Sequence, residues 1–353
     1  MTDSLKLKDF DFQLPESLIA QKPLNIRDQS KLMVIDRKSG SIKHEIFSRI
    51  HHLLPTQSLM VFNNTKVIPS KLNGHQIKNG RPVEILLIKK TSDETQWESL
   101  IKGLKKIRLG TEMVFGNGEL KAVLIRRHEN KAILKLIYDG NLDNVLNRIG
   151  KMPLPPYIRR KANEDNGFSD QDKEKYQTIF ASHPGAIAAP TAGLHFTPRI
   201  IESLNKKGIE TASLTLHVGI GTFQPIRTET IIEHKMQPEQ FYIPKETSKA
   251  LINARKGLKK IVGVGSTVTR VLESVELNRL KPSRSSGWTN RFIYPGSKFK
   301  VVDHLLTNFH LPKSTLYLLV CAFAGKKLIM EAYEEAILKK YRFFSYGDAM
   351  LII

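Results

Sequence analysis

The chain has 353 residues, of which 41% are hydrophobic and 25% charged. This composition is typical of a folded globular protein, and the length predicts about two domains. The single cysteine, Cys321, excludes an intramolecular disulfide and any multi-cysteine metal site, and its apolar neighbours predict a buried core thiol. No signal-peptide pattern opens the sequence, and the longest apolar run, 316–324, is about half a membrane span. We therefore expect a cytoplasmic protein outside the membrane.

The charge balance indicates a polyanionic partner. Lysine and arginine number 55 against 34 aspartate and glutamate residues, which gives a net charge of +21. A charge of this size attracts nucleic acid, although a lysine-rich proteome would produce the same excess. The positive residues are dispersed along the chain, as at 102–108 and 159–161, and form no basic tail. We therefore expect them on a folded surface.

The first 150 residues divide into two stretches of different character. Residues 1–70 mix helical turns with apolar runs at 32–36 and 59–62, which predict buried strands. Residues 71–150 hold short β-rich runs separated by polar turns, including the hairpin signal Gly116-Asn117-Gly118, and they end in a predicted helix over 142–149. The runs are 83–88, 97–101, 113–115, 120–125 and 132–138. They predict an inserted antiparallel β-barrel domain over 71–150.

The rest of the chain, 151–353, reads as the main part of an α/β domain whose first part is 1–70. A proline cluster at 153–156 and the polar stretch 163–173 predict a linker or lid. Strands and helices then alternate, which predicts a mostly parallel sheet. The expected strands or extended segments are 209–218, 260–265, 299–306 and 349–353. The expected helices are 198–206, capped by Thr197, and 245–256, 267–280, 315–324 and 327–341.

Two kinds of loop could carry chemistry in this domain. The glycine turn at 263–267 joins a strand to a helix, where backbone N–H groups bind anions, although close packing alone can also demand glycine. Four further loops each place an ionisable side chain among small residues: His195, His217, His310 and Asp348. Histidine suits proton transfer near neutral pH, and four such loops together favour a catalytic cleft over isolated structural roles. No metal-binding or P-loop motif is present, so we expect no metal site.

Long motifs in these same loops resemble one enzyme family. GAIAAPTAGLHFTP at 185–198, TLHVGIGTFQPI at 215–226, VVDHLLTNFHLPKSTL at 301–316 and YRFFSYGDAMLI at 341–352 are similar to the S-adenosylmethionine:tRNA ribosyltransferase-isomerases. KYQTIFA at 175–181 and two N-terminal segments, DFDFQLPESLIAQKPL and VFNNTKVIPSKL, extend the resemblance over nearly the whole chain.

The resemblance implies a reaction. The family transfers and isomerises the ribosyl moiety of S-adenosylmethionine onto 7-aminomethyl-7-deazaguanine at the tRNA wobble position, giving epoxyqueuosine and releasing adenine and methionine. It also implies an α/β domain with an inserted barrel, which agrees with the break at 71–150. No cofactor beyond the co-substrate S-adenosylmethionine is expected, because the sulfonium itself acidifies the ribose C5′–H and makes methionine a leaving group. The expected partner is tRNA, and the expected state is a monomer.

The same resemblance suggests site residues. His195, His217 and His310 are the candidates for proton transfer, with His195 first, and Asp303 and Asp348 could face the sulfonium or orient a histidine. The candidates for binding S-adenosylmethionine are Gly219, Gly221, Thr222, Gly265, Thr267 and Arg270.

The chain departs from the family pattern at four positions. Asn64, Lys66 and Lys175 stand where the family carries aspartate, arginine and arginine. Gln237 stands where a second histidine is usual, which leaves His234 and Glu239 as candidates in that stretch. Two other functions remain open at this point: an S-adenosylmethionine-dependent RNA methyltransferase and a non-catalytic tRNA-binding protein.

Overall fold

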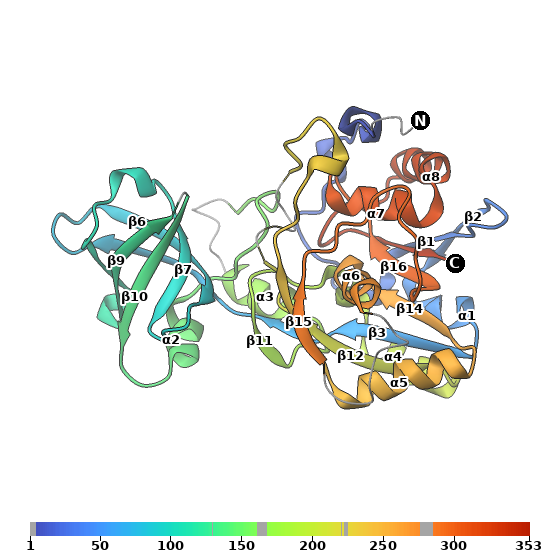
Figure 1. Ribbon diagram of the computed structural model, residues 1–353, viewed down its shortest axis with the longest axis horizontal. Coiled ribbons are helices and arrows are strands. Elements are labelled where there is room, and N and C mark those ends of the chain that lie inside the picture. Colours follow the sequence, from blue (N-terminus) through green and yellow to red (C-terminus); the bar gives the residue numbers. More distant parts are fainter. Residues whose placement is uncertain (1–4, 129, 161–167, 220, 222–224, 276–284) are drawn as a thin grey trace.

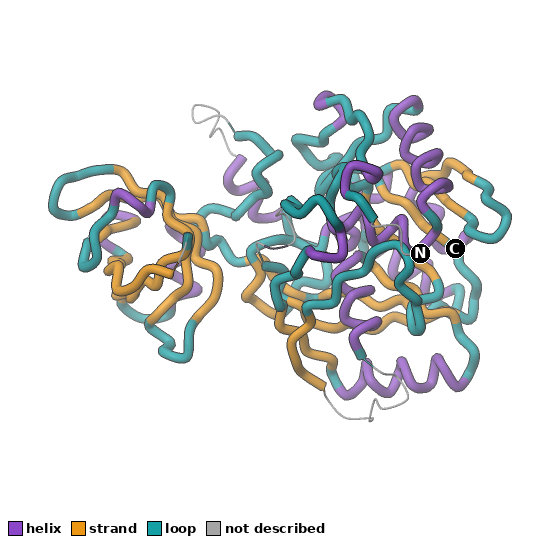
Figure 2. The backbone as a smooth tube through the Cα atoms, turned by 45° about the horizontal axis from the view of Figure 1, so that its top comes forward, coloured by secondary structure: helices purple, strands orange, loops and turns teal. Residues whose placement is uncertain are grey.

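The computed structural model describes residues 5–128, 130–160, 168–219, 221, 225–275 and 285–353. In this part of the chain a layered main domain carries a smaller barrel at one end (Figure 1). Figure 2 shows the two as separate bodies that are joined by loops.

The main domain is built on a nine-stranded sheet with the order β15-β13-β12-β3-β14-β16-β17-β1-β2. The strands are β1 (Lys31–Ile35), β2 (Ile42–Ile46), β3 (Ser58–Asn63), β12 (Glu210–Leu216), β13 (Glu239–Ile243), β14 (Lys260–Val264), β15 (Ser285–Thr289), β16 (His304–Asn308) and β17 (Ala349–Ile352). The central strands β12, β3, β14 and β16 run parallel, and so do β17 and β1.

The sheet is less parallel than the sequence predicts. The pairs β15–β13, β13–β12, β16–β17 and β1–β2 are antiparallel. The expectation of a mostly parallel sheet is therefore confirmed only for the central strands. Strand–helix alternation in a sequence predicts parallel strands, because two parallel neighbours need a crossover connection between them. Strands β2, β13 and β15 are short and partly polar, and they join the sheet near its edges without such a crossover.

The predicted antiparallel barrel is confirmed. Six strands close in the order β10-β7-β6-β5-β8-β9, and every neighbouring pair is antiparallel. They are β5 (Lys71–Gln76), β6 (Pro82–Lys90), β7 (Gln96–Ile101), β8 (Glu112–Phe115), β9 (Leu120–His128) and β10 (Lys131–Tyr138). Alternating residues such as Leu134 and Leu136 fill the interior, and helix α2 (Leu142–Ile149), capped by Asn141, packs against the same core. The domain boundaries at 71 and 150 stay a prediction.

Helices cover both faces of the main sheet. The buried side chains of α1 (Ile50–Leu53) and α4 (Pro198–Lys206) join one core cluster, and those of α5 (Lys245–Lys256), α6 (Ser266–Ser274), α7 (Thr315–Ala324) and α8 (Lys326–Leu338) join the other. The helix predicted over 267–280 ends at Ser274, and its last residues lie outside the described ones. Of the predicted linker or lid, the described parts are the proline cluster at 153–156 and residues 168–173, which lie in α3 (Phe168–Lys175). Strand β4 (Thr65–Val67) pairs with β11 (His183–Ala186).

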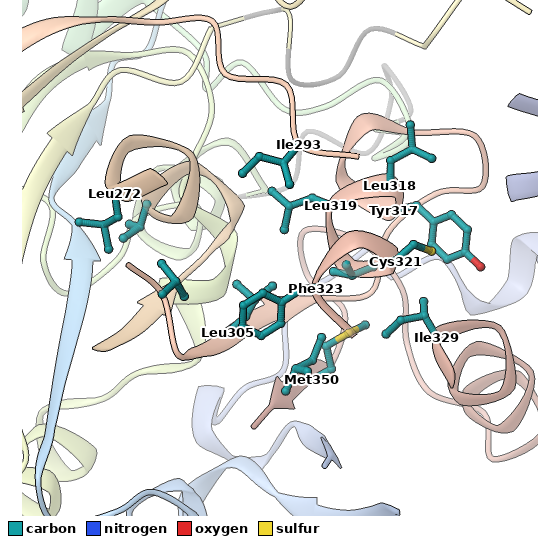
Figure 3. Packing of buried hydrophobic residues seen from close by; sticks show 14 of the residues in the cluster. Leu272, Ile293, Leu305, Tyr317, Leu318, Leu319, Cys321, Phe323, Ile329 and Met350 are labelled. Carbon is teal, nitrogen blue, oxygen red and sulfur yellow. The ribbon is translucent and has the colours of Figure 1, made fainter. Parts of the chain in front are cut away.

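Cys321 is a core residue, as its sequence surroundings predict. It is 1% exposed on α7, where Figure 3 shows it with Leu319 and Phe323, beside Leu305 and Met350 of the sheet. Burial raises the pKa of its thiol to about 12, so the thiol stays protonated and unreactive at neutral pH.

Candidate active site

A cavity of about 590 Å³ lies at the carboxyl edge of the central parallel strands. Its wall includes a residue from the end of each of three strands: Val218 after β12, Gly265 after β14 and Asn308 at the end of β16. Ligands of open α/β sheets bind at this edge, because the strands deliver loops and helix N-termini there. The volume is in the range of small-molecule sites.

The N-terminus of α6 forms one wall. Gly265, with a φ of 95°, adopts a conformation that suits glycine and turns the chain from β14 into the helix, and its N–H donates to Leu306 O at 2.8 Å. Ser266 and Thr267 then begin α6 and line the cavity. The unpaired N–H groups of a first helical turn attract anions. Gly265 and Thr267 thus lie where an anionic group of a ligand could bind, as the sequence suggests.

His310 lies on the cavity wall directly after β16, with 6% of its surface exposed. Its Nε2 is 2.9 Å from Thr307 Oγ1, and its backbone N–H donates to the Tyr333 hydroxyl at 3.0 Å. Burial lowers the pKa of the imidazole to about 3, so the ring is neutral at neutral pH. A neutral imidazole beside a ligand cavity can accept a proton.

His195 lies behind the wall, in the 3-10 turn Thr191–His195. It is 5% exposed and is not among the residues that line the large cavity. Its Nδ1 is 2.8 Å from Ser30 Oγ, and its Nε2 is 3.1 Å from the amide Nδ2 of Asn308, which does line the cavity. Burial, followed by nearby arginine charge, lowers the pKa of His195 to about 3. Both ring nitrogens are therefore occupied: Nδ1 contacts Ser30, and Nε2 contacts the amide of Asn308.

The other three candidates for the proton chemistry, His217, Asp303 and Asp348, do not line this cavity either. His217 is partly buried after β12, where its Nδ1 contacts Thr65 Oγ1 at 2.8 Å. Asp303 precedes β16, so it lies at the opposite, amino edge of the sheet, and its Oδ2 accepts from Ile261 N at 2.9 Å. The length of β16 separates Asp303 from His310, so Asp303 does not orient that histidine.

Asp348 clamps a turn. It is 3% exposed, and its two carboxylate oxygens accept from the backbone N–H groups of Lys31 at 3.0 Å and Arg342 at 2.8 Å. Burial raises the pKa of this carboxyl. Asp348 therefore holds the backbone at Lys31 and Arg342 together, which indicates a positioning role.

Arg270 and Gly219 are linked through Glu239. Arg270 Nη1 pairs with Glu239 Oε2, and the two side chains are 4% and 5% exposed. The other oxygen, Oε1, accepts from Gly219 N at 3.1 Å. Glu239 thus joins α6 to the loop after β12, and Arg270 contacts this link rather than the large cavity. Gly221 lies against the side chain of Gln237, and Thr222 lies outside the described residues.

The four residues that depart from the family pattern do not line the large cavity. Asn64 is buried and its Oδ1 accepts from Thr215 Oγ1 at 2.7 Å, whereas Lys66 is exposed. Lys175 shares a small pocket with His195. Gln237 lines a different cavity, between the barrel and the main domain.

Sequence reasoning missed several residues of the large cavity. Tyr157, Asn308, Phe344 and Ser345 all line it. The motifs at 301–316 and 341–352 contain three of them, but residue type drew attention to the histidine and aspartate in those loops. Tyr157 follows a proline cluster, and no pattern distinguishes it from a linker residue.

A cleft of about 770 Å³ separates the barrel from the main domain. The charged residues that line it are mostly basic: Arg126, Lys131, Arg227 and Lys235, against Glu98 and Glu233. His234 also lines this cleft, edge-on to Phe292. Lys131 is paired with Glu98, Nζ to Oε1 at 2.7 Å, and the remaining excess of positive charge favours an anionic ligand.

Within the described residues, no group of three or more histidine, cysteine, aspartate or glutamate side chains is arranged to hold a metal ion. None of the described helices is long and apolar enough to cross a membrane.

Together, the fold and the site define an α/β protein that has a small-molecule cavity at the carboxyl edge of its sheet and a basic cleft beside a separate β-barrel. A family model described as "Queuosine biosynthesis protein" matches residues 7–352. The chain belongs to this queuosine biosynthesis protein family.

Relatives and a solved structure agree with this family. The chain is 49% identical over 352 residues to the S-adenosylmethionine:tRNA ribosyltransferase-isomerase of Caldanaerobacter subterraneus subsp. tengcongensis, an alignment that covers 99% of this chain and 100% of the relative. It is 47% identical, with the same coverage, to the enzyme of that name from Halothermothrix orenii. A crystal structure of S-adenosylmethionine tRNA ribosyltransferase from Thermotoga maritima is 39% identical, with a TM-score of 0.55, and covers 98% of this chain and 100% of its own.

Proposed function

We propose that the chain is an S-adenosylmethionine:tRNA ribosyltransferase-isomerase, which transfers and isomerises the ribosyl moiety of S-adenosylmethionine onto 7-aminomethyl-7-deazaguanine in tRNA. The observation that carries this proposal is the likeness, at 49% and 47% identity over 99% of the chain, to enzymes of that name. A further support is spatial: Ala192, Val218, Asn308 and Ser345, from the four long motifs, line one cavity.

S-adenosylmethionine binds in this cavity as co-substrate. Its methionine carboxylate lies at the N-terminus of α6, where Gly265, Ser266 and Thr267 line the wall and the helix dipole favours an anion. The sulfonium acidifies the neighbouring ribose C5′–H and makes methionine a leaving group. The protein then supplies a base for that proton and an acid for the departing adenine, and no other cofactor is needed.

His310 is the first candidate for the base. It lies on the cavity wall with a neutral ring, whereas His195 is enclosed by Ser30 and Asn308 behind the wall. Burial keeps His310 unprotonated before the step. His195 then acts as a positioning residue that holds the amide of Asn308. His217, Asp303 and Asp348 support the surrounding loops.

The tRNA lies across the basic cleft between barrel and main domain. Arg126, Lys131, Arg227 and Lys235 line that cleft, and the net charge of +21 favours a polyanion. The protein acts as a monomer in the cytoplasm, where tRNA is found and where a free thiol such as Cys321 stays reduced.

The released small molecules test this function. Incubated with S-adenosylmethionine and tRNA that carries 7-aminomethyl-7-deazaguanine, the protein should release adenine and methionine in equal amounts, as measured by chromatography. S-adenosylhomocysteine as the main product would identify a methyltransferase instead. Absence of any released product, with tRNA still bound, would identify a non-catalytic binding protein.

A further inference from the structure

An aromatic pair forms part of the wall of the large cavity. Tyr157 and Phe344 both line it, and their rings are stacked with centroids 4.4 Å apart and planes at 26°. Tyr157 comes from the segment that leaves the barrel, and Phe344 comes from the turn before β17. The fold therefore brings two distant segments together to make one apolar surface.

The pair is held in place by polar contacts around it. The Tyr157 hydroxyl lies 2.5 Å from Ser345 Oγ, and Ser345 also lines the cavity. The backbone N–H of Phe344 donates to Phe309 O at 3.1 Å. Both rings are thus oriented before a ligand arrives, which lowers the entropic cost of binding.

Phe344 is held in a strained backbone conformation. Its φ of 73° lies in the left-handed region that residues with a side chain rarely adopt. The turn around Phe344 is tight. Gly347 N donates to Phe344 O at 2.8 Å, and a Cβ on Gly347 would lie only 2.5 Å from Arg342 O. The carboxylate of Asp348 also closes this turn, through Arg342 N at 2.8 Å. Strain of this kind persists mainly at ligand clamps and active sites, where it fixes a side chain that function requires.

We propose that the stacked pair of Tyr157 and Phe344 is the surface on which the adenine of S-adenosylmethionine stacks. This inference rests on the proposed function. The same cavity has the N-terminus of α6 on its wall, at Gly265–Thr267, which suits a carboxylate. A ligand with a carboxylate at one end and a purine at the other can use both, because aromatic side chains bind the faces of nucleobases. The pair then also retains the adenine while its bond to the ribose breaks.

Equilibrium binding of small ligands tests the pair. The variants are Phe344→Leu and Tyr157→Leu, which replace a ring by an apolar side chain, and Tyr157→Phe, which keeps the ring. Phe299→Leu is a matched control, because Phe299 packs partly buried on the same core, edge-on to Phe323, away from the cavity. The probes are S-adenosylmethionine, adenosine and tRNA, each measured alone by calorimetry or filter binding. Thermal unfolding checks that each variant is folded.

The expected result is a loss of about tenfold in affinity for both S-adenosylmethionine and adenosine in Phe344→Leu and Tyr157→Leu, since one base–aromatic stack is worth that much. Tyr157→Phe keeps the ring and loses only the hydroxyl contact with Ser345, so it should lose much less affinity than Tyr157→Leu. Phe299→Leu should bind like the wild type, and tRNA affinity should not change. If Phe344→Leu does not fold, the comparison of Tyr157→Leu with Tyr157→Phe decides.

Three outcomes would overturn the proposal. Unchanged affinity for both adenine-containing probes would remove the pair from ligand binding. A loss for S-adenosylmethionine but not for adenosine would mean that the rings contact the sulfonium, because adenosine has none. A loss for tRNA alone would assign the rings to a base of the tRNA. Each leaves the proposed function intact if the wild type still releases adenine and methionine, whereas release of S-adenosylhomocysteine would overturn the function itself.

Discussion

At the scale of single residues, two equally buried histidines differ in what surrounds them. His310 and His195 have equally low pKa values, about 3, because both are buried. They differ in what surrounds them: His310 lines the cavity, and His195 contacts Ser30 and Asn308. The histidine that we propose as the base therefore lies on the cavity wall, and the one that we propose as a positioning residue lies behind it.

This difference predicts distinct kinetic effects. His310→Gln should lower the single-turnover rate by about 10²-fold or more, because a general base is lost, with affinities for S-adenosylmethionine and tRNA nearly unchanged. His195→Asn should lower rate and S-adenosylmethionine affinity together, because Asn308 loses its support. Rapid-quench kinetics and calorimetry measure the two quantities. A His310→Gln enzyme that turns over normally, beside a His195→Asn enzyme that only loses rate, would restore His195 as the base.

The pH profile gives a second readout for His310. Protonation removes a histidine base as the pH falls through its pKa, and that of His310 is about 3 in the free protein, below the ordinary 6.5. The value of kcat/KM for S-adenosylmethionine reports the free enzyme. It should therefore show no acid limb near pH 6.5 that depends on His310. The contradicting result is a fall of kcat/KM below pH 6.5 that the wild type shows and His310→Gln lacks. It would mean that His310 has an ordinary pKa in the free protein.

At the scale of elements, one buried ion pair joins α6 to the strand and loop beside it. Arg270 of α6 pairs with Glu239 of β13, and Glu239 also accepts from Gly219 N. Removing one partner of a buried pair leaves an uncompensated charge. Arg270→Met should therefore lower the free energy of unfolding by about 3–5 kcal/mol.

Urea unfolding measures this loss in the free energy of unfolding, and two further variants serve as comparisons. Arg270→Met combined with Glu239→Gln should recover part of the stability, because the buried charge is gone. Lys206→Met removes an exposed i,i+4 pair with Glu202 on α4 and should leave the free energy of unfolding nearly unchanged. Equal losses of stability in Arg270→Met and Lys206→Met would show that the buried pair stabilises the fold no more than an exposed pair does.

The sequence predicts elements well where one pattern dominates. Helix 315–324 is an apolar run behind the cap Ser314, and both its limits are confirmed, as are those of 245–256. Strands β13, β15 and β5 were not predicted, because they are short, partly polar or interrupted by Gly74.

The site divides in the same way. Gly265, Thr267 and His310 could be chosen from the sequence, since glycine turns and histidines carry a chemical signal, and all three line the cavity. Tyr157 and Phe344 carry no such signal. Their importance comes from a stacked contact and a positive φ that only the tertiary structure creates.

At the scale of the whole molecule, the barrel and the main domain face each other across the basic cleft. If tRNA lies there, affinity should fall steeply with salt, since each neutralised phosphate releases counterions. Arg126→Gln and Arg227→Gln, from opposite sides of the cleft, should each reduce the slope of log affinity against log salt by about 0.7–0.9.

Filter binding across a salt series measures these slopes. Lys327→Gln is the control, because Lys327 is 93% exposed on α8, on the far side of the main domain from the barrel (Figure 1). Its slope should equal that of the wild type. S-adenosylmethionine affinity should not respond to salt in any of these proteins. Equal slopes for all variants would mean that tRNA uses another surface.

Position-specific labelling of S-adenosylmethionine tests the central claim most directly. In one reaction the ribose carbons carry the label, and in a parallel reaction the S-methyl group carries it; the tRNA is then isolated and counted. Ribosyl transfer predicts that the ribose label enters the tRNA in proportion to the adenine released, while the methyl label leaves with free methionine. Methyl label in the tRNA, with the ribose label left in S-adenosylhomocysteine, would contradict ribosyl transfer and establish methylation in its place.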